Sequence, residues 1–107
     1  MTDIFGLCVK AIVKWGAANQ IVKCVEELNE LAVKLLHWRN FKADKKEVLE
    51  EIADVEITII QMKLLIDDEG SYKEIFNEKV VKFRSNFTKE ELKELESEEN
   101  KCLKKEN

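Results

Sequence analysis

The sequence predicts an all-α protein, and three observations support this fold class. The 107 residues contain no proline and only three glycines, so few positions interrupt a helix. Apolar residues recur at alternating intervals of four and three, which is the helical period, and no segment shows the alternation of a strand. At three points an acidic or hydroxyl residue precedes a glutamate by three positions, which is the spacing of a helix capping box.

The N-terminal part is expected to hold two helices. The first covers residues 3–15, and Gly16 separates it from a long helix over residues 17–39. A loop over residues 40–43 follows. The long helix carries a regularly spaced apolar seam, suited to packing against an antiparallel helix, that consists of Ile21, Val25, Leu28, Ala32 and Leu35.

The C-terminal part begins with a second long helix over residues 45–67, and Asp44 is its expected N-cap. After the break at Gly70, a third helix is expected over residues 72–85 and a charged tail helix after Thr88. The second long helix has its own apolar seam, Val48, Ile52, Val55, Ile59, Met62 and Ile66, and further apolar residues beside it, Ile57, Ile60, Leu64 and Leu65.

These elements predict a helical bundle built on a long antiparallel helix hairpin. The short loop at residues 40–43 forces the two long helices to fold back on each other. Because the second long helix is apolar around most of its circumference, it needs more cover than a 107-residue monomer provides. The bundle is therefore expected to be completed by homo-oligomerisation, as a dimer or a tetramer.

Charge and composition argue against several other classes. The net charge of -4 argues against a nucleic-acid partner, which would require a basic face. No run is long and apolar enough to span a membrane, and the first residues lack a signal-peptide pattern. The three cysteines show no metal-binding spacing, which is typical of reduced cysteines in a cytoplasmic protein.

Two acidic doublets, Glu27 with Glu30 and Glu51 with Asp54, are the candidate site. Residues three apart share one face of a helix. Each doublet lies in the middle of a polar stripe beside an apolar seam; the stripes also contain Gln20, Lys23, Lys34 and His37 on the first helix, and Glu47, Thr58 and Gln61 on the second. If the stripes face each other, four carboxylates converge, and such oxygen ligands suit Mg²⁺, with Mn²⁺ as a substitute.

The runs from Glu26 to Leu31 and from Glu50 to Val55 resemble the ExxE…ExxD signature of the MazG-like nucleotide pyrophosphohydrolases, of the all-alpha NTP pyrophosphatase superfamily. The resemblance covers roughly residues 15–84 and implies a catalytic domain over residues 1–87, followed by a charged tail over 88–107. It implies Mg²⁺-dependent hydrolysis of a (d)NTP to a (d)NMP and pyrophosphate. The metal ligands and catalytic residues would be Glu27, Glu30, Glu51 and Asp54.

Five further residues are candidates for binding the nucleotide. Lys23 could reach a phosphate or pair with the acid one turn away, and Gln20 could bond the sugar or base. Trp15 and Trp38 are candidates for stacking on the base, with core or interface packing as the alternative. The resemblance implies a phosphate-binding lysine in the third helix, where Lys79 stands, but Phe83 occupies a position where some relatives have asparagine.

Two alternative functions stay open at this point. A phosphoribosyl-ATP pyrophosphatase-like enzyme would share the acidic signature, although it usually carries Tyr-His after the second doublet, where this chain has the run from Glu56 to Ile59. A non-catalytic helical interaction or assembly module would show the same apolar seams, with its acidic stripes solvated. A di-iron carboxylate bundle is excluded because its Glu-x-x-His motif is absent, since Lys34 precedes His37 by three residues.

Overall fold

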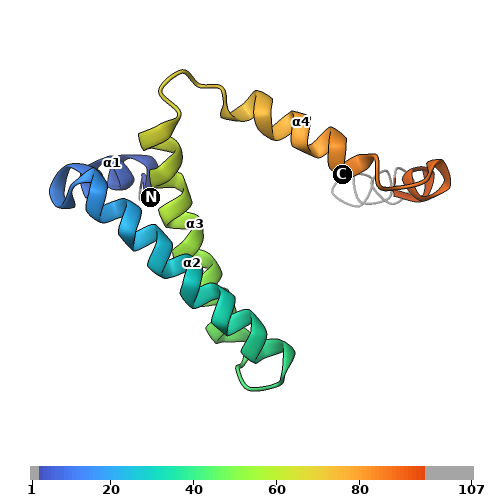
Figure 1. The fold of residues 1–107 in the computed structure, drawn as a ribbon, viewed down its shortest axis with the longest axis horizontal. Helices are drawn as coiled ribbons and strands as arrows, with labels where there is room; N and C mark the ends of the chain where they lie inside the picture. Colours follow the sequence, from blue (N-terminus) through green and yellow to red (C-terminus); the bar gives the residue numbers. More distant parts are fainter. Residues whose placement is uncertain (1–2, 96–107) are drawn as a thin grey trace. The chain divides into compact units, whose positions relative to one another are not determined.

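The computed structural model describes residues 3–95, and within them every regular element is an α-helix (Figure 1). The all-α prediction is confirmed, and each helix begins and ends within one residue of its expected bounds. A further helical stretch runs from residue 89 to the end of the described part. The four named helices are α1 (Ile4–Trp15), α2 (Ala17–Arg39), α3 (Lys45–Ile66) and α4 (Tyr72–Arg84).

The chain forms two compact units, Met1–Gly70 and Ser71–Asn107. The first contains α1, α2 and α3, and the second contains α4 and the helical stretch from residue 89. Residues 96–107 of the expected charged tail, including Cys102, lie outside the described residues. None of the described helices combines the length and the apolar character needed to cross a membrane.

Local chemistry explains where the helices begin. Gly16, at φ 91°, makes the break between α1 and α2 in a conformation that residues with a Cβ atom rarely adopt. The Asp44 carboxylate accepts a hydrogen bond from the backbone N–H of Glu47 at 2.8 Å and so caps α3. Thr88 and Glu91 form a reciprocal capping box, with bonds of 3.2 and 3.3 Å.

The C-terminus of α2 ends in a Schellman motif. The N–H of Phe41 donates to the carbonyl of Trp38 at 3.0 Å, and the N–H of Lys42 donates to the carbonyl of His37 at 2.7 Å. This geometry requires a left-handed residue, and Phe41 occupies that position with φ 60°. Glycine is the usual choice there, so a fully exposed phenylalanine carries backbone strain in this loop.

Helices α2 and α3 lie side by side and run in opposite directions (Figure 1). Gln20, near the start of α2, bonds to Gln61, near the end of α3. Lys34, towards the end of α2, pairs with Glu47 in the first turn of α3. The short helix α1 packs against both of them, and its Cys8 thiol lies 3.8 Å from the carbonyl oxygen of Ile57.

Half of the buried side chains in this part of the chain are polar or charged. The buried apolar residues are Cys8, Cys24, Val48 and Val55, and the buried polar residues are Gln20, Glu27, Thr58 and Gln61. Cys8 and Cys24 carry free thiols, and burial raises the pKa of Cys8. The packing of α2 on α3 therefore depends on satisfied polar groups as well as on apolar contact.

The expected role of the α2 seam was wrong. Ile21, Val25 and Leu28 are 47%, 51% and 44% exposed, whereas Gln20 and Glu27 are buried. The buried positions of α2 are instead Gln20, Cys24 and Glu27, where Gln20 bonds to Gln61 of α3, and the apolar seam is left outside. On α3 the prediction holds better, since Val48 and Val55 are buried and Ile52, Ile59 and Met62 are partly buried.

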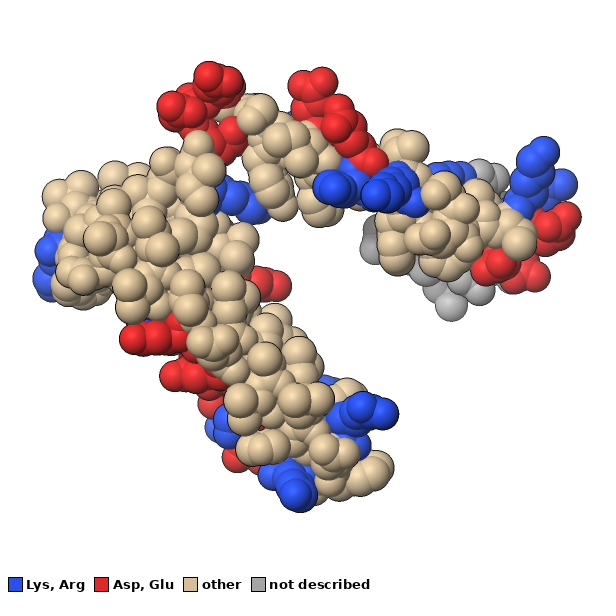
Figure 2. Space-filling view, in the orientation of Figure 1, with Lys and Arg blue, Asp and Glu red and all other residues tan. Residues whose placement is uncertain are grey.

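The surface of the first unit separates its charges. Acidic side chains gather along the α2–α3 pair, and basic side chains gather at the end where the loop joins the two helices (Figure 2). The basic residues in and around that loop are Arg39, Lys42, Lys45 and Lys46. A large part of the visible face carries no charge, which agrees with the exposure of the apolar seam of α2.

Candidate metal centre

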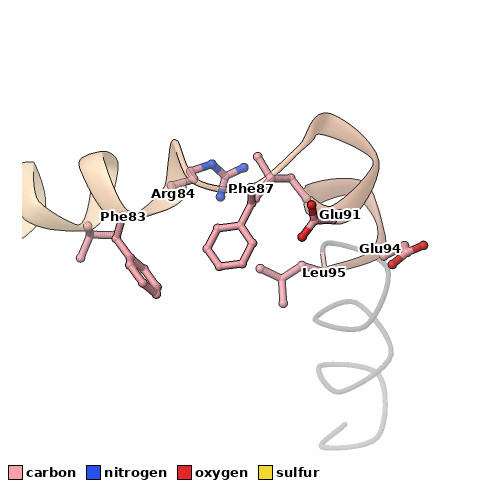
Figure 3. Close-up of a pocket in the computed structure, with 8 residues that line it drawn as sticks. Phe83, Arg84, Phe87, Glu91, Glu94 and Leu95 are labelled. Atoms are coloured by element: carbon pink, nitrogen blue, oxygen red, sulfur yellow. The ribbon is translucent and has the colours of Figure 1, made fainter.

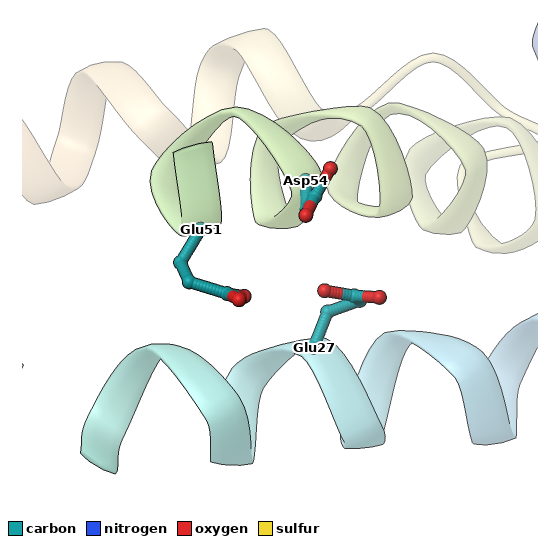
Figure 4. A group of neighbouring side chains, drawn as sticks. All are labelled: Glu27, Glu51 and Asp54. Carbon is teal, nitrogen blue, oxygen red and sulfur yellow. The ribbon is translucent and has the colours of Figure 1, made fainter. Parts of the chain in front are cut away.

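Three carboxylates from two helices converge in the first unit. Glu27 projects from α2 and Glu51 from α3 into the space between the helices, and the exposed Asp54 lies beside them on α3 (Figure 4). One oxygen of each carboxylate lies within 4.8 Å of the others. The spacing of Glu51 and Asp54 places both on one face of α3, and the antiparallel packing of α2 brings Glu27 opposite them.

Two oxygens of this cluster are buried without a hydrogen-bond partner. The Glu27 side chain is only 7% exposed; its Oε1 accepts from Lys23 Nζ at 2.9 Å, and its Oε2 has no partner. Glu51 Oε2 is in the same situation. An unpaired buried carboxylate oxygen is costly, and a divalent cation is the ligand that would satisfy several of them at once.

Electrostatics set the protonation of two groups at the cluster. Burial raises the pKa of Glu51 above its ordinary value, and repulsion from Glu30, Glu27 and Asp54 raises it further. Lys34 opposes this shift. A hydrogen bond and an ion pair with Glu27 raise the pKa of Lys23, so the ammonium stays charged and offsets part of the negative charge of the cluster.

Glu30, the fourth predicted ligand, lies at the edge of the cluster. It is exposed and does not belong to the group of three converging carboxylates. Together with Glu51 it lines an open pocket of about 540 Å³ that also contains Asn29, Val33 and Lys34. The pocket therefore places a cation and an amide beside two carboxylates.

Sequence reasoning assigned Asn29 and Lys34 no role in binding. The available signal was the spacing of Lys34 four residues after Glu30, which puts both on one face of α2. The reserve general-base candidates, Glu26 and Glu50, are both exposed. Glu50 is within 3.9 Å of Lys46 Nζ, an arrangement that fits a solvated helix face.

The remaining predicted residues of the first unit lie in three different settings. Lys23 is engaged with Glu27, and Gln20 is buried with its amide donating to Gln61 at 2.6 Å. Trp15 ends α1 about half exposed, with the Lys14 ammonium 5.1 Å from its ring centroid. Trp38 is also about half exposed and follows Glu30 by eight residues, which is about 12 Å along a helix.

Lys79 lies in the second unit, on α4. It lines a pocket of about 390 Å³ with Lys82, Phe83, Ser85 and Asn86. An asparagine is thus present beside Lys79, although it comes from a position later in the chain than the one the resemblance implies. That position could not be found from helical spacing, because α4 ends at Arg84.

A larger pocket of about 520 Å³ also belongs to the second unit (Figure 3). Its wall is mainly apolar, with Phe83, Phe87 and Leu95 facing the opening and Arg84 and Glu91 at its rim. None of the four predicted metal ligands lines it. It offers an apolar surface with three charged groups, Arg84, Glu91 and Glu94, but no arrangement of nucleophile, base or metal ligands.

No family model, curated protein or solved structure matches this chain. The features of this chain that indicate a function are therefore the geometry of its carboxylates and the resemblance of its acidic doublets to a known motif. Chemically, the cluster is a set of hard oxygen donors, partly buried and flanked by two lysines, Lys23 and Lys34. That set fits Mg²⁺ or Mn²⁺ and an anionic ligand beside it.

Proposed function

We propose that this protein is a Mg²⁺-dependent nucleoside triphosphate pyrophosphohydrolase that converts a (d)NTP to a (d)NMP and pyrophosphate. The observation that carries the proposal is the meeting of Glu27, Glu51 and Asp54 between α2 and α3 with two buried oxygens unsatisfied. The reaction class comes from the resemblance of the two acidic doublets to the MazG-like signature.

In this proposal the carboxylates bind the metal, and the lysines contact the substrate and the metal ligands. Glu27, Glu51 and Asp54 would hold the metal, with Glu30 joining from the edge. The bound metal would supply charge neutralisation at the phosphates and a lowered pKa for an attacking water. Lys34, which pairs with Glu47 and lines the open pocket with Glu30 and Glu51, would also donate to a phosphate of the substrate, and Lys23 would orient Glu27 through their ion pair.

The proposal includes a MazG-like bundle in which the α2–α3 hairpin is completed by another copy of the chain. The support is the exposed seam of α2, where Ile21, Val25, Leu28 and Leu35 are all more than 40% exposed. Their alternating spacing of four and three suits helix–helix packing. Contiguous apolar surface of this kind is rare on monomers, and a second copy presents the complementary seam.

The activity can be tested with a panel of canonical and modified nucleoside triphosphates in the presence of Mg²⁺. Pyrophosphate and phosphate release are measured separately for the wild type, Glu27→Gln and Asp54→Asn. We expect pyrophosphate release from the wild type and a loss of at least about a hundredfold in either variant, because each removes a metal ligand. Glu56→Gln, an exposed acid on the same helix as Asp54, is the matched control and should keep its activity.

Two results would contradict the proposal. Release of phosphate without pyrophosphate from every nucleotide would rule out cleavage between the α and β phosphates. Equal activity of the wild type and both carboxylate variants would show that these residues do not hold the catalytic metal.

A further inference from the structure

Two contacts between α2 and α3 flank the carboxylate cluster, each seven residues along the helices from its centre. Gln20 Nε2 donates to Gln61 Oε1 at 2.6 Å on one side, and Lys34 Nζ lies 3.5 Å from Glu47 Oε2 on the other. Gln20 precedes Glu27 by seven residues and Lys34 follows it by seven. On α3, Gln61 and Glu47 stand seven residues to either side of Asp54, so both contacts belong to the single antiparallel register that places Glu27 opposite Asp54.

This register places like charges opposite each other. It brings Glu27 against Asp54 and Glu51, and it puts Glu30 beside Glu51 in the open pocket. Carboxylates so close together repel one another, and the repulsion favours any rotation or sliding of α2 that separates them. Metal chelation requires the opposite, because ligands must be held to within about 0.5 Å of their productive positions.

The stability of the fold does not by itself explain why Gln20 and Gln61 form a buried polar contact. Both side chains are buried, at 7% and 5% exposure, and a buried pair of this kind can be replaced by apolar residues of similar size at little cost. An apolar replacement would not fix the relative position of the helices, because a hydrogen bond requires a defined geometry whereas apolar side chains can pack in several registers. A buried polar contact between helices is a known means of specifying register.

We propose that the Gln20–Gln61 hydrogen bond and the Lys34–Glu47 ion pair are positioning contacts that hold α2 and α3 in the register at which their carboxylates meet. This inference rests on the proposed metal site and adds residues that act through the ligands rather than on the substrate. The Gln20–Gln61 bond carries most of this role, because the Lys34–Glu47 pair is 35% and 46% exposed and correspondingly weak.

The test compares two double variants in which the polar bond is removed or replaced. Gln20→Leu/Gln61→Leu removes the bond and keeps the volume, whereas Gln20→Lys/Gln61→Glu restores a bond with the same donor and acceptor helices and no change in net charge. Mn²⁺ affinity is measured from the electron paramagnetic resonance signal of the free ion, and stability from thermal unfolding of the metal-free protein.

The expected results run in opposite directions for stability and for metal affinity. The leucine pair should unfold at the same or a higher temperature than the wild type, yet bind Mn²⁺ at least about tenfold more weakly, as expected for the loss of a contact that orients ligands. The Lys/Glu pair should unfold at a lower temperature and bind Mn²⁺ nearly as tightly as the wild type. A purely structural role would make both properties change together.

Thr58→Val is the matched control. Thr58 is a buried polar residue of the same helix as Gln61, but its hydroxyl donates to the carbonyl of Val55 within α3 at 2.8 Å rather than to α2. Its replacement removes a buried polar group and should leave Mn²⁺ affinity unchanged. Unchanged Mn²⁺ affinity in the leucine pair, or an equal loss in Thr58→Val, would overturn the proposal.

A separate measurement distinguishes failure of this inference from failure of the proposed function. If the wild type binds no Mn²⁺, the metal site is refuted, and the register is then judged from nuclear Overhauser contacts between α2 and α3 in the metal-free protein. The wild type should give one set of contacts, and the leucine pair should give a shifted or second set. An identical single set in both proteins would refute the positioning role.

Discussion

The two carboxylate oxygens of Glu27 lie in different surroundings. Its Oε1 is neutralised by Lys23, whereas its Oε2 is buried among other carboxylates without a partner. The half-exposed Lys23 therefore pairs with the acid on one side, while the other oxygen stays available to a cation. The ion pair at one oxygen offsets part of the cost of burying this carboxylate.

At the residue scale, the raised pKa of Glu51 predicts a pH dependence of stability. In the unfolded chain its pKa returns to the ordinary value of a glutamate, so between that value and the raised pKa the folded state binds more protons. The free energy of unfolding of the metal-free protein should therefore fall as pH rises through this window. Glu51→Gln removes the effect, and at neutral pH the variant should be more stable than the wild type, as measured by urea unfolding.

The control for this prediction is Glu50→Gln, which removes the same charge from the neighbouring, exposed position. Its stability should follow that of the wild type across the same pH range. Saturating Mg²⁺ should reverse the order of wild type and Glu51→Gln, because only the wild type keeps all the ligands. A wild type and a Glu51→Gln variant with parallel pH profiles would show that repulsion at the cluster is relieved in some other way.

At the scale of the elements, the loop between α2 and α3 combines strong capping with backbone strain. Asp44 caps α3 through its side chain, and a Schellman motif closes α2. Both devices fix the length of the connection, and the connection limits how far the two helices can shift along each other. The left-handed Phe41 is the strained point of this arrangement.

Phe41→Gly should stabilise the protein by roughly 0.5–1 kcal/mol. Glycine adopts φ near 60° without the steric cost that a side chain brings, and this gain exceeds the greater backbone entropy of glycine in the unfolded chain. Phe41 is 97% exposed, so its removal loses almost no packing within the chain. The free energy of unfolding from urea denaturation measures the change.

Asn40→Gly provides the comparison, since Asn40 precedes Phe41 in the same loop but has a negative φ of -96°. Glycine there should not stabilise the protein, because no positive-φ strain is relieved. Equal effects of the two substitutions would mean that the conformation of Phe41 carries no strain.

At the scale of the whole molecule, the first unit has too little apolar core for the apolar residues it contains. Four apolar side chains are buried among the described residues, while the seam of α2 faces outward. Association of two copies through this seam would remove apolar surface from water at about 25 cal/mol per Å². The proposed oligomer is thus a consequence of turning the polar stripe inward.

Val25→Glu should weaken this association. The substitution places a charge in the middle of the α2 seam, where it would have to be desolvated on assembly. In sedimentation velocity experiments, the wild type should sediment as a multiple of the 12.5 kDa chain, and the variant should shift towards the monomer at the same concentration.

Val13→Glu makes the same chemical change at an exposed position of α1, outside the seam. It should leave the sedimentation coefficient of the wild type unchanged. A monomeric wild type would refute the oligomer proposal, and it would leave the metal-binding measurements to be judged independently.

The helices were predictable because their determinants are local. Gly16, Asp44 and Gly70 mark boundaries through conformation and hydrogen bonding within a few residues. The carboxylate candidates were predictable for a related reason: spacing on a helix decides which residues share a face, and this placed Glu51 with Asp54 without any knowledge of the fold.

The face that α2 presents to α3 was not predictable in this way. Its apolar seam and its polar stripe are both continuous along the helix, and hydrophobicity alone favours burial of the seam. The choice depends on which groups α3 offers, and Gln61 and Glu47 satisfy Gln20 and Lys34 across the interface. Such pairings join residues far apart in sequence, so no local sequence pattern predicts them.

The sequence by itself determined that the chain is helical, where its helices begin and end, and which acids could act together. Only the tertiary structure decided that Glu27 meets Glu51 and Asp54, that Glu30 lies at their edge, and that the apolar seam of α2 stays outside. The physical reason is that helix formation follows from interactions within a few residues, whereas the convergence of charges requires a register between helices that long-range polar contacts must hold.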